Sequence, residues 1–196
     1  EVLRQPMEER HVTISRAKVS VDYPANFMLI ASMNPCPCGY YNHPEKDCVC
    51  PPGAVQKYLN RISGPLLDRI DLHVEVTPVN FDQLTAIEVS ENSHSIRERV
   101  LKARQIQASR FEAIKGIHAN AQMPSQMVKK MCTINTAGQN LLKTAMERLG
   151  LSARAYDRIL KVARTIADLA NSEEIKVEHL AEAINFRTLD RENWAK

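Results

Sequence analysis

The sequence predicts a mixed α/β part in residues 1–76 and an all-helical part in residues 95–196. β-rich alternating segments and a short apolar run lie in the first part. From residue 95 onward the apolar positions recur at helical spacing, and residues 77–94 show the poor periodicity of a connector. A chain of 196 residues has room for one domain or two small ones.

Composition restricts the possible partners and the location. A net charge of +3 is too small to indicate a nucleic-acid partner by itself, so the distribution of charge matters more. Lys and Arg exceed Asp and Glu in the C-terminal half, with clusters in residues 97–115 and 148–164. No apolar run approaches the length of a membrane span, and no charged-then-apolar leader occurs. We therefore expect a cytoplasmic protein with no membrane partner.

The first residues read as a helix already under way at residues 2–5, so we expect the sequence to start inside a domain. Residues 11–15 and 19–23 are β-rich and alternate, which predicts a hairpin. Its tip carries Arg16 and Lys18. These two side chains could contact nucleic-acid phosphates, although charged hairpin tips are more often only solvated.

Residues 27–31 form a short apolar run between two prolines, which predicts a buried central strand. Asn34 follows this run. In open α/β sheets ligands bind beyond the carboxyl ends of the strands, so Asn34 is a candidate ligand contact. An asparagine that caps a turn before Pro35 explains the residue equally well.

Four cysteines form two close pairs, Cys36 with Cys38 and Cys48 with Cys50. Thiolates bind Zn²⁺ tetrahedrally, and a bound ion would stabilise a proline-rich loop that has little core of its own. The C-x-C spacing chelates one ion less easily than C-x-x-C, and His43 could replace one thiolate. The alternative is four reduced thiols without metal. Four thiolates leave no open position, so we expect the zinc to be structural.

Arg69 lies between Asp68 and Asp71. One interpretation is a local salt bridge of small energetic value. The other is an arginine that the flanking carboxylates hold so that its guanidinium projects toward a phosphate on a neighbouring molecule. Residues 72–76 then alternate apolar and polar, which predicts a strand with His73 on its polar face.

The C-terminal part predicts a series of amphipathic helices. Ser95 can cap the first helix, and Pro124 suits the first turn of a short one. A helix over residues 136–149 is closed by Gly150. The inward positions of the first helix are Ile96, Val100, Ala103, Gln107 and Phe111. Cys132 lies among helical residues and is most simply a small buried apolar side chain.

Ser152 is a suitable N-cap for the next helix, which places Arg154 in the first turn beside the positive end of the helix dipole. A bound anion would make that position favourable, because it would receive backbone N–H groups and the guanidinium together. A surface arginine tolerated at small cost is the alternative. Residues 177–187 predict a final amphipathic helix.

Over essentially its whole length the sequence resembles the C-terminal part of the ComM/YifB family, the magnesium-chelatase-related AAA+ ATPases of bacteria. The matching segments are VLRQP (2–6), VTISRA (12–17), MNPCPCG (33–39), SGPLLDRID (63–71), LSARAY (151–156) and VARTIADL (162–169). The resemblance implies the C-terminal half of an AAA+ α/β core over 1–76, with a pre-sensor-1 β-hairpin and a Cys-rich loop. It also implies a helical AAA+ lid domain over 95–196.

The resemblance also implies roles for single residues. Asn34 matches sensor 1, which orients the attacking water, and Arg69 matches the arginine finger that reaches the neighbouring subunit's ATP. Arg154 matches sensor 2, which contacts the γ-phosphate from the lid. The hairpin is similar to the pre-sensor-1 hairpin of related helicases, which faces DNA, and this favours DNA contact by Arg16 and Lys18.

One family feature does not occur in these 196 residues: the Walker A pattern G-x-x-x-x-G-K-[ST] that cradles the phosphates of ATP. In the family it lies upstream of the matching part, with the Walker B acids. Because phosphoryl transfer depends on positioning and on charge neutralisation by Mg²⁺, we expect this chain alone not to hydrolyse ATP.

For the full-length protein the resemblance implies Mg²⁺-dependent ATP hydrolysis in a homo-hexameric ring. The hydrolysis would be coupled to DNA translocation or branch migration during recombination of incoming DNA. Two alternatives remain open: a chelatase-type motor for metal insertion, and a non-catalytic assembly or binding module.

Overall fold

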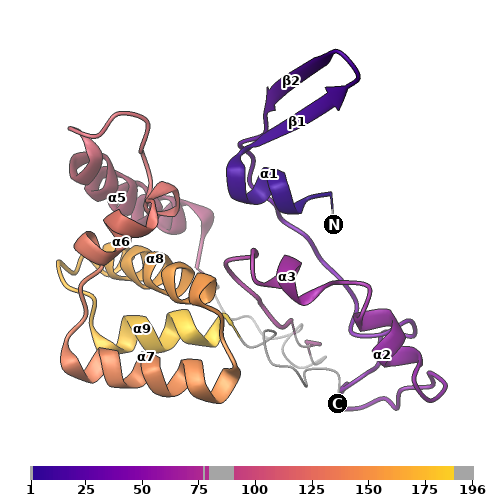
Figure 1. Cartoon of the computed structure of the whole chain (residues 1–196). Helices are drawn as coiled ribbons and strands as arrows, with labels where there is room; N and C mark the ends of the chain where they lie inside the picture. The colour runs from indigo at the N-terminus through magenta and orange to yellow at the C-terminus, as the bar shows by residue number, and fades with distance from the viewer. Residues whose placement is uncertain (1, 77, 80–90, 188–196) are drawn as a thin grey trace. The chain divides into compact units, whose positions relative to one another are not determined.

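The computed structural model describes residues 2–76, 78–79 and 91–187 of the chain (Figure 1). Two compact units divide the chain, the first ending at Ile70 and the second beginning at Asp71. Of the expected connector over 77–94, residues 77 and 80–90 lie outside the described residues. No helix in the described ranges is both long and apolar enough to cross a membrane.

The first unit contains short helices and one hairpin. Its elements are α1 (Arg4–Glu9), β1 (His11–Arg16), β2 (Val19–Pro24), α2 (Ala54–Leu59) and α3 (Gly64–Leu67). The strands pair antiparallel, with Thr13 opposite Asp22 and Arg16 opposite Val19, and this confirms the predicted hairpin (Figure 1). α1 ends at Arg10, whose left-handed φ of 60° turns the chain into β1.

The hairpin has two chemically different faces, because side chains alternate along each strand. On one face the Thr13 hydroxyl donates to the Asp22 carboxylate at 2.6 Å, and the hydroxyls of Ser15 and Ser20 lie 2.7 Å apart. The other face is largely apolar and, apart from the half-buried Val12, exposed. It carries Val12, Ile14, Val21 and Tyr23, together with the Arg16–Val19 pair.

The prediction of a buried central strand over residues 27–31 is wrong for this chain. The structure assigns no strand there, and Met28 and Ile30 are each 82% exposed. A strand needs a neighbour for its backbone hydrogen bonds, and the described residues form only one sheet, the β1–β2 pair. The apolar run therefore has composition suited to a strand but no partner strand in the described part of the chain.

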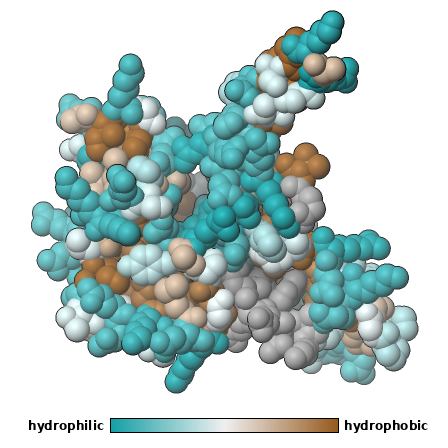
Figure 2. All heavy atoms as spheres, in the orientation of Figure 1, coloured by the Kyte–Doolittle hydropathy of each residue, from teal (hydrophilic) through white to brown (hydrophobic). Residues whose placement is uncertain are grey.

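The second unit is helical and packs around α8. Its elements are α5 (Ser93–Phe111), the 3₁₀ turn η1 (Asn120–Gln122), α6 (Ser125–Met131), α7 (Thr136–Leu149), α8 (Ala153–Leu169) and α9 (Val177–Asn185). α8 contacts α5, α6, α9 and η1, while α7 packs on α9 (Figure 1). Figure 2 shows that the outer surface of these helices is mostly hydrophilic, with small apolar areas between them.

The core of this unit forms where the apolar stripes of the helices meet. Leu142 of α7, Ile159 of α8 and Leu180 of α9 are at most 1% exposed. Cys132 lies in the same core, which confirms it as a small buried apolar residue. Burial raises the pKa of its thiol to about 11, so the group stays neutral at physiological pH.

Most of the predicted helix boundaries in this unit are confirmed. Gly150 ends α7 with a left-handed φ of 62°, and the Ser152 side chain accepts the N–H of Ala155 at the start of α8. The predicted cap of α5 is wrong: Asn92, not Ser95, caps the helix and accepts the Ser95 N–H at 2.9 Å. An Asx oxygen three residues before a backbone N–H satisfies it as well as a serine does.

The inward stripe predicted for α5 is correct only in its C-terminal half. Ala103, Gln107 and Phe111 are buried, whereas Ile96 and Val100 are 43% and 46% exposed. The C-terminal half of α5 is the part that joins the core of this unit.

The predicted strand over residues 72–76 is also wrong. No strand is assigned there, and burial does not alternate along the segment: His73 is buried, whereas its neighbours on both sides are exposed, including Val74 at 64% and Val76 at 87%. The His73 backbone N–H donates to the carbonyl of Phe186 at 2.8 Å. This bond attaches the segment to Phe186, the residue that ends α9.

Candidate functional site

The four predicted cysteine ligands come together in the first unit. Their sulfur atoms all lie within 4.8 Å of one another. The Cys36 sulfur lies 3.3 Å from that of Cys38 and 3.7 Å from that of Cys48, and Cys38 and Cys48 are 3.6 Å apart. Tetrahedral zinc with Zn–S bonds of about 2.3 Å separates its sulfurs by about 3.8 Å. The cluster is close to that size, and none of its members forms a disulfide.

A tight turn folds the chain around the first cysteine pair. Gly39 has a φ of 83°, and its N–H donates to the Cys36 carbonyl at 3.0 Å, which closes a turn around the first pair. The backbone N–H of Tyr40 lowers the pKa of Cys38 to about 6, although partial burial opposes this shift. The Cys38 backbone N–H also lowers the pKa of Cys50, but burial and hydrogen bonds with the other three thiols outweigh it and raise that pKa to about 12. Without a metal the four thiols therefore do not all ionise near pH 7.

His43 is not a member of the sulfur cluster. Its Nδ1 accepts the backbone N–H of Glu45 at 3.1 Å, and its ring packs edge-on against Tyr40, with centroids 5.6 Å apart. The Lys46 ammonium lies over the Tyr40 ring, 5.1 Å from its centroid. These contacts fold the loop between the two cysteine pairs and leave the four thiols as the candidate ligands.

Asn34 lies two residues before this cluster, in an exposed segment with no regular secondary structure. A side chain there can reach a ligand outside the chain. The alternative role, a cap of the turn before Pro35, is not supported by any hydrogen bond of the Asn34 side chain within the described residues. Its assignment as sensor 1 stays a prediction.

Arg69 follows α3 and is bound by residues that sequence spacing did not indicate. Its Nε donates to the Glu8 carboxylate at 3.0 Å, and its Nη2 donates to the same oxygen. Nη1 donates to the Pro65 carbonyl at 2.6 Å. Glu8 lies on α1, 61 residues upstream, so no local pattern could have predicted this pair.

Asp71 binds a different arginine. Its carboxylate accepts from Arg158, one turn beyond Arg154 on α8. Arg154 itself is exposed in the first turn of α8, as predicted, beside the Ser152 cap. Arg154 belongs to the second unit, whereas Asn34 and Arg69 belong to the first.

Arg16 and Lys18 are both exposed at the tip of the hairpin. Arg16 is the last residue of β1 and pairs with Val19, so it lies on the apolar face of the hairpin. Lys18 lies in the turn that joins the strands. Both could reach an external phosphate, and their contact with DNA stays a prediction.

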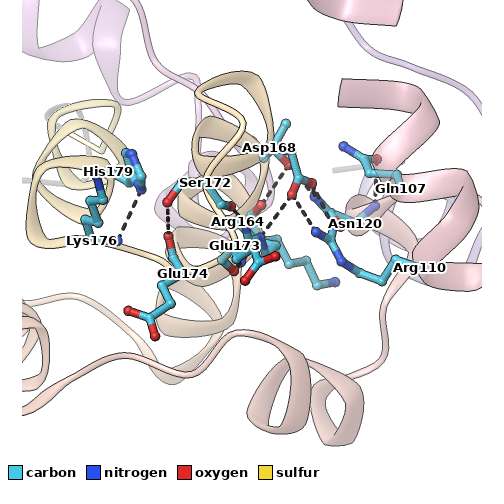
Figure 3. A network of polar contacts seen from close by, with 12 residues as sticks. Gln107, Arg110, Asn120, Arg164, Asp168, Ser172, Glu173, Glu174, Lys176 and His179 are labelled. Atoms are coloured by element: carbon cyan, nitrogen blue, oxygen red, sulfur yellow. Dashed lines mark hydrogen bonds and ion pairs between the residues drawn. The ribbon is translucent and has the colours of Figure 1, made fainter. Parts of the chain in front are cut away.

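The helix that carries Arg154 is anchored by a buried polar network that sequence reasoning missed (Figure 3). The Asp168 carboxylate, fully buried, accepts from both Nη atoms of Arg110 at 2.7 and 2.5 Å. It also accepts from Asn120 at 2.7 Å and from Arg164 at 3.2 Å. The network therefore ties α8 to α5 and η1.

The Arg164 side chain extends the network to the loop before α9. Its Nη atoms donate to the carbonyls of Glu173 and Ser172 at 2.6 and 2.5 Å. Gln107 adds a bond to the Asn120 N–H at 3.2 Å. The sequence held one signal for this network: Asp168 follows Arg164 by four residues on a helix, a spacing that allows an ion pair. The same spacing is common on solvated helix faces, so it did not indicate a buried network.

Comparison with known proteins gives matches over most of the chain. Residues 1–84 match the family described as magnesium chelatase, subunit ChlI, and residues 90–187 match the magnesium chelatase, subunit ChlI C-terminal family. The competence protein ComM of Haemophilus influenzae is 43% identical over 193 residues. The uncharacterized protein YifB of Escherichia coli is 38% identical over 195 residues.

A protein of Mycobacterium tuberculosis is 34% identical over 187 residues. These three matches cover 95–97% of the present chain but only 36–37% of each relative. The chain thus spans little more than a third of the length of the curated relatives it matches.

Proposed function

The chain belongs to the magnesium-chelatase-related family that includes ComM and YifB, and from this we propose that it is part of an AAA+ ATPase that acts on DNA. In this proposal the whole protein hydrolyses ATP with Mg²⁺ in a homo-hexameric ring and couples hydrolysis to DNA translocation or branch migration. The observation that carries the proposal is the 43% identity to a protein named for competence, sustained over 97% of this chain.

Three residues would act on the nucleotide. Asn34 would orient the attacking water, and Arg69 would reach the γ-phosphate of the neighbouring subunit. Arg154 would contact the same phosphate from the helical unit. The exposed setting of Asn34 and the first-turn position of Arg154 support these roles. The parts that cradle ATP and Mg²⁺ would come from segments outside this sequence.

The cysteine cluster would hold a structural zinc ion. Sulfur separations of 3.3–3.7 Å among Cys36, Cys38 and Cys48 support this ligand set, with Cys50 as the fourth thiolate. The ion would fix the loop that directly follows Asn34. It would therefore stabilise the position of a proposed catalytic residue without taking part in the reaction.

ATP hydrolysis by the full-length protein, with and without single-stranded or branched DNA, tests the proposed activity. We expect DNA to stimulate turnover, and we expect Arg69→Ala to reduce turnover by about 10³-fold or more while nucleotide binding persists. Retained turnover in Arg69→Ala would refute the arginine-finger assignment. Arg16→Ala with Lys18→Ala should weaken DNA stimulation and leave basal turnover intact.

A chelatase-type motor is the second candidate, because both matching families are described by magnesium chelatase. Such a motor would drive metal insertion into a tetrapyrrole and would not respond to DNA. Hydrolysis that is the same with and without every DNA tested would therefore favour this candidate. The roles of Asn34, Arg69 and Arg154 would be unchanged.

Metal analysis of protein purified without added metal tests the zinc site. We expect one zinc per chain, and we expect Cys48→Ser to lose the ion. Cys132→Ala is the matched control, because this cysteine lies in the helical core and should leave the zinc content unchanged. Substoichiometric zinc in the unmodified protein would argue for plain thiols.

A further inference from the structure

We propose that Glu8 is a regulatory residue that holds the guanidinium of Arg69 in a resting position and releases it when a neighbouring subunit presents a phosphate. This inference rests on the proposed function, in which Arg69 acts across a subunit interface. It adds a second state of that arginine and names the residue that stabilises it.

The contacts of Arg69 define the resting state. Nε and Nη2 both donate to one oxygen of Glu8, and Nη1 donates to the Pro65 carbonyl. A guanidinium has five N–H donors, so these bonds engage three of them. The Arg69 side chain is only 10% exposed, whereas an arginine that reaches into another subunit has to be accessible. Arg69 must therefore leave this position to contact a phosphate in trans.

A carboxylate and a phosphate compete directly for the guanidinium. The planar fork of arginine binds either group through paired N–H donors, so the edge that faces Glu8 cannot serve both acceptors. Only the Glu8 side of the pair is open to water: its side chain is 42% exposed, against 10% for Arg69, so solvent screens the carboxylate and the contact can exchange. The contact can therefore hold Arg69 in the isolated subunit and still give way to the higher charge of a nucleotide triphosphate.

Subunit association in the presence of a non-hydrolysable ATP analogue measures the competition. In the full-length protein we expect Glu8→Ala to lower the protein concentration for half-maximal association by about two- to fivefold, the range of an exposed ion pair. Glu8→Gln should show a smaller decrease, because an amide oxygen still accepts a hydrogen bond but carries no charge. A damaged fold would raise this concentration, so a purely structural role of Glu8 predicts the opposite change.

Glu9→Gln is the matched control. Glu9 lies next to Glu8 on α1, accepts from Gln5 at 2.8 Å and lies 3.6 Å from the His11 ring, and the bonds of Arg69 go to Glu8 and Pro65 instead. We expect the Glu9→Gln variant to reach half-maximal subunit association at the same protein concentration as the unmodified protein. An equal decrease in Glu9→Gln would overturn the inference, since it would reflect lost negative charge on α1 in general.

A double-mutant cycle separates this inference from the proposed function. In the Arg69→Ala background, Glu8→Ala should have no effect on association, because the guanidinium for which the two groups compete is gone. An unchanged or raised half-maximal concentration in Glu8→Ala alone would overturn the resting-state inference. If Arg69→Ala keeps its ATP hydrolysis, the arginine-finger assignment itself fails, whatever Glu8 does.

Discussion

At the scale of single residues, Asp168 is the acid that neutralises two arginines in the helical unit. Its carboxylate is fully buried and binds two guanidinium groups, those of Arg110 and Arg164. A buried ion pair adds little net stability over an apolar pair, but removal of one partner leaves an uncompensated buried charge. The network is therefore sensitive to the loss of its acid.

We expect Asp168→Asn to lower the free energy of unfolding by about 3 to 5 kcal/mol, because it leaves both guanidinium groups without a counter-charge. Urea denaturation followed by circular dichroism measures the change. Asp157→Asn is the control, because this acid lies on the same helix outside the network and should change stability by less than about 0.5 kcal/mol. Similar losses in the two variants would contradict the special role of Asp168.

Sequence reasoning succeeded for residues whose role depends on neighbours close in the chain. Ser152 and Gly150 could be predicted as caps because a cap acts within three or four residues. The cysteine cluster could be predicted for the same reason, since each pair is separated by one residue. The Glu8–Arg69 pair could not, because 61 residues of sequence separate its members.

At the scale of elements, the sequence predicted the helices correctly, but the strands that it predicted over residues 27–31 and 72–76 do not form. A helix satisfies its own backbone hydrogen bonds, so the local pattern of α7, α8 and α9 was sufficient. A strand depends on a partner. Residues 27–31 and 72–76 have strand-like composition, but the described part of the chain gives them none, whereas the hairpin supplies its own.

The end of α7 gives a test at this scale. We expect Gly150→Ala to destabilise the protein by about 1 kcal/mol, because alanine is strained at a φ of 62°. A Cβ added there would meet no other atom within 4 Å, so crowding would not contribute. Gly150→Asn should lose less stability, since asparagine tolerates the left-handed region. Thermal or urea unfolding of both variants measures the difference, and equal losses would contradict this explanation.

At the scale of the whole molecule, the chain passes from one compact unit to the other between Ile70 and Asp71. The first residues of the second unit are fixed to its helices at two points. Asp71 pairs with Arg158 of α8, and the His73 N–H bonds to the Phe186 carbonyl. The segment that follows Arg69 in sequence is thus attached to the helix that carries Arg154.

We expect Arg158→Ala to change the free energy of unfolding by less than about 1 kcal/mol, as for other exposed ion pairs. It should nevertheless increase the hydrogen-exchange rate of the His73 amide, because one of the two attachments is lost. Lys129→Ala, on the exposed side of α6, is the control and should leave that amide unchanged. Unaltered protection of His73 in Arg158→Ala would show that the ion pair does not fix the segment.

The exposed apolar segments have a consequence for handling the protein. Phe27, Met28 and Ile30, with Val74 and Val76 in the other segment, present β-prone side chains that no described strand covers. Such stretches pair edge to edge with other chains when they are uncovered. Aggregation of this chain would therefore begin at these two segments, and a lysine placed at Ile30 or Val76 is the first change to make for a soluble sample.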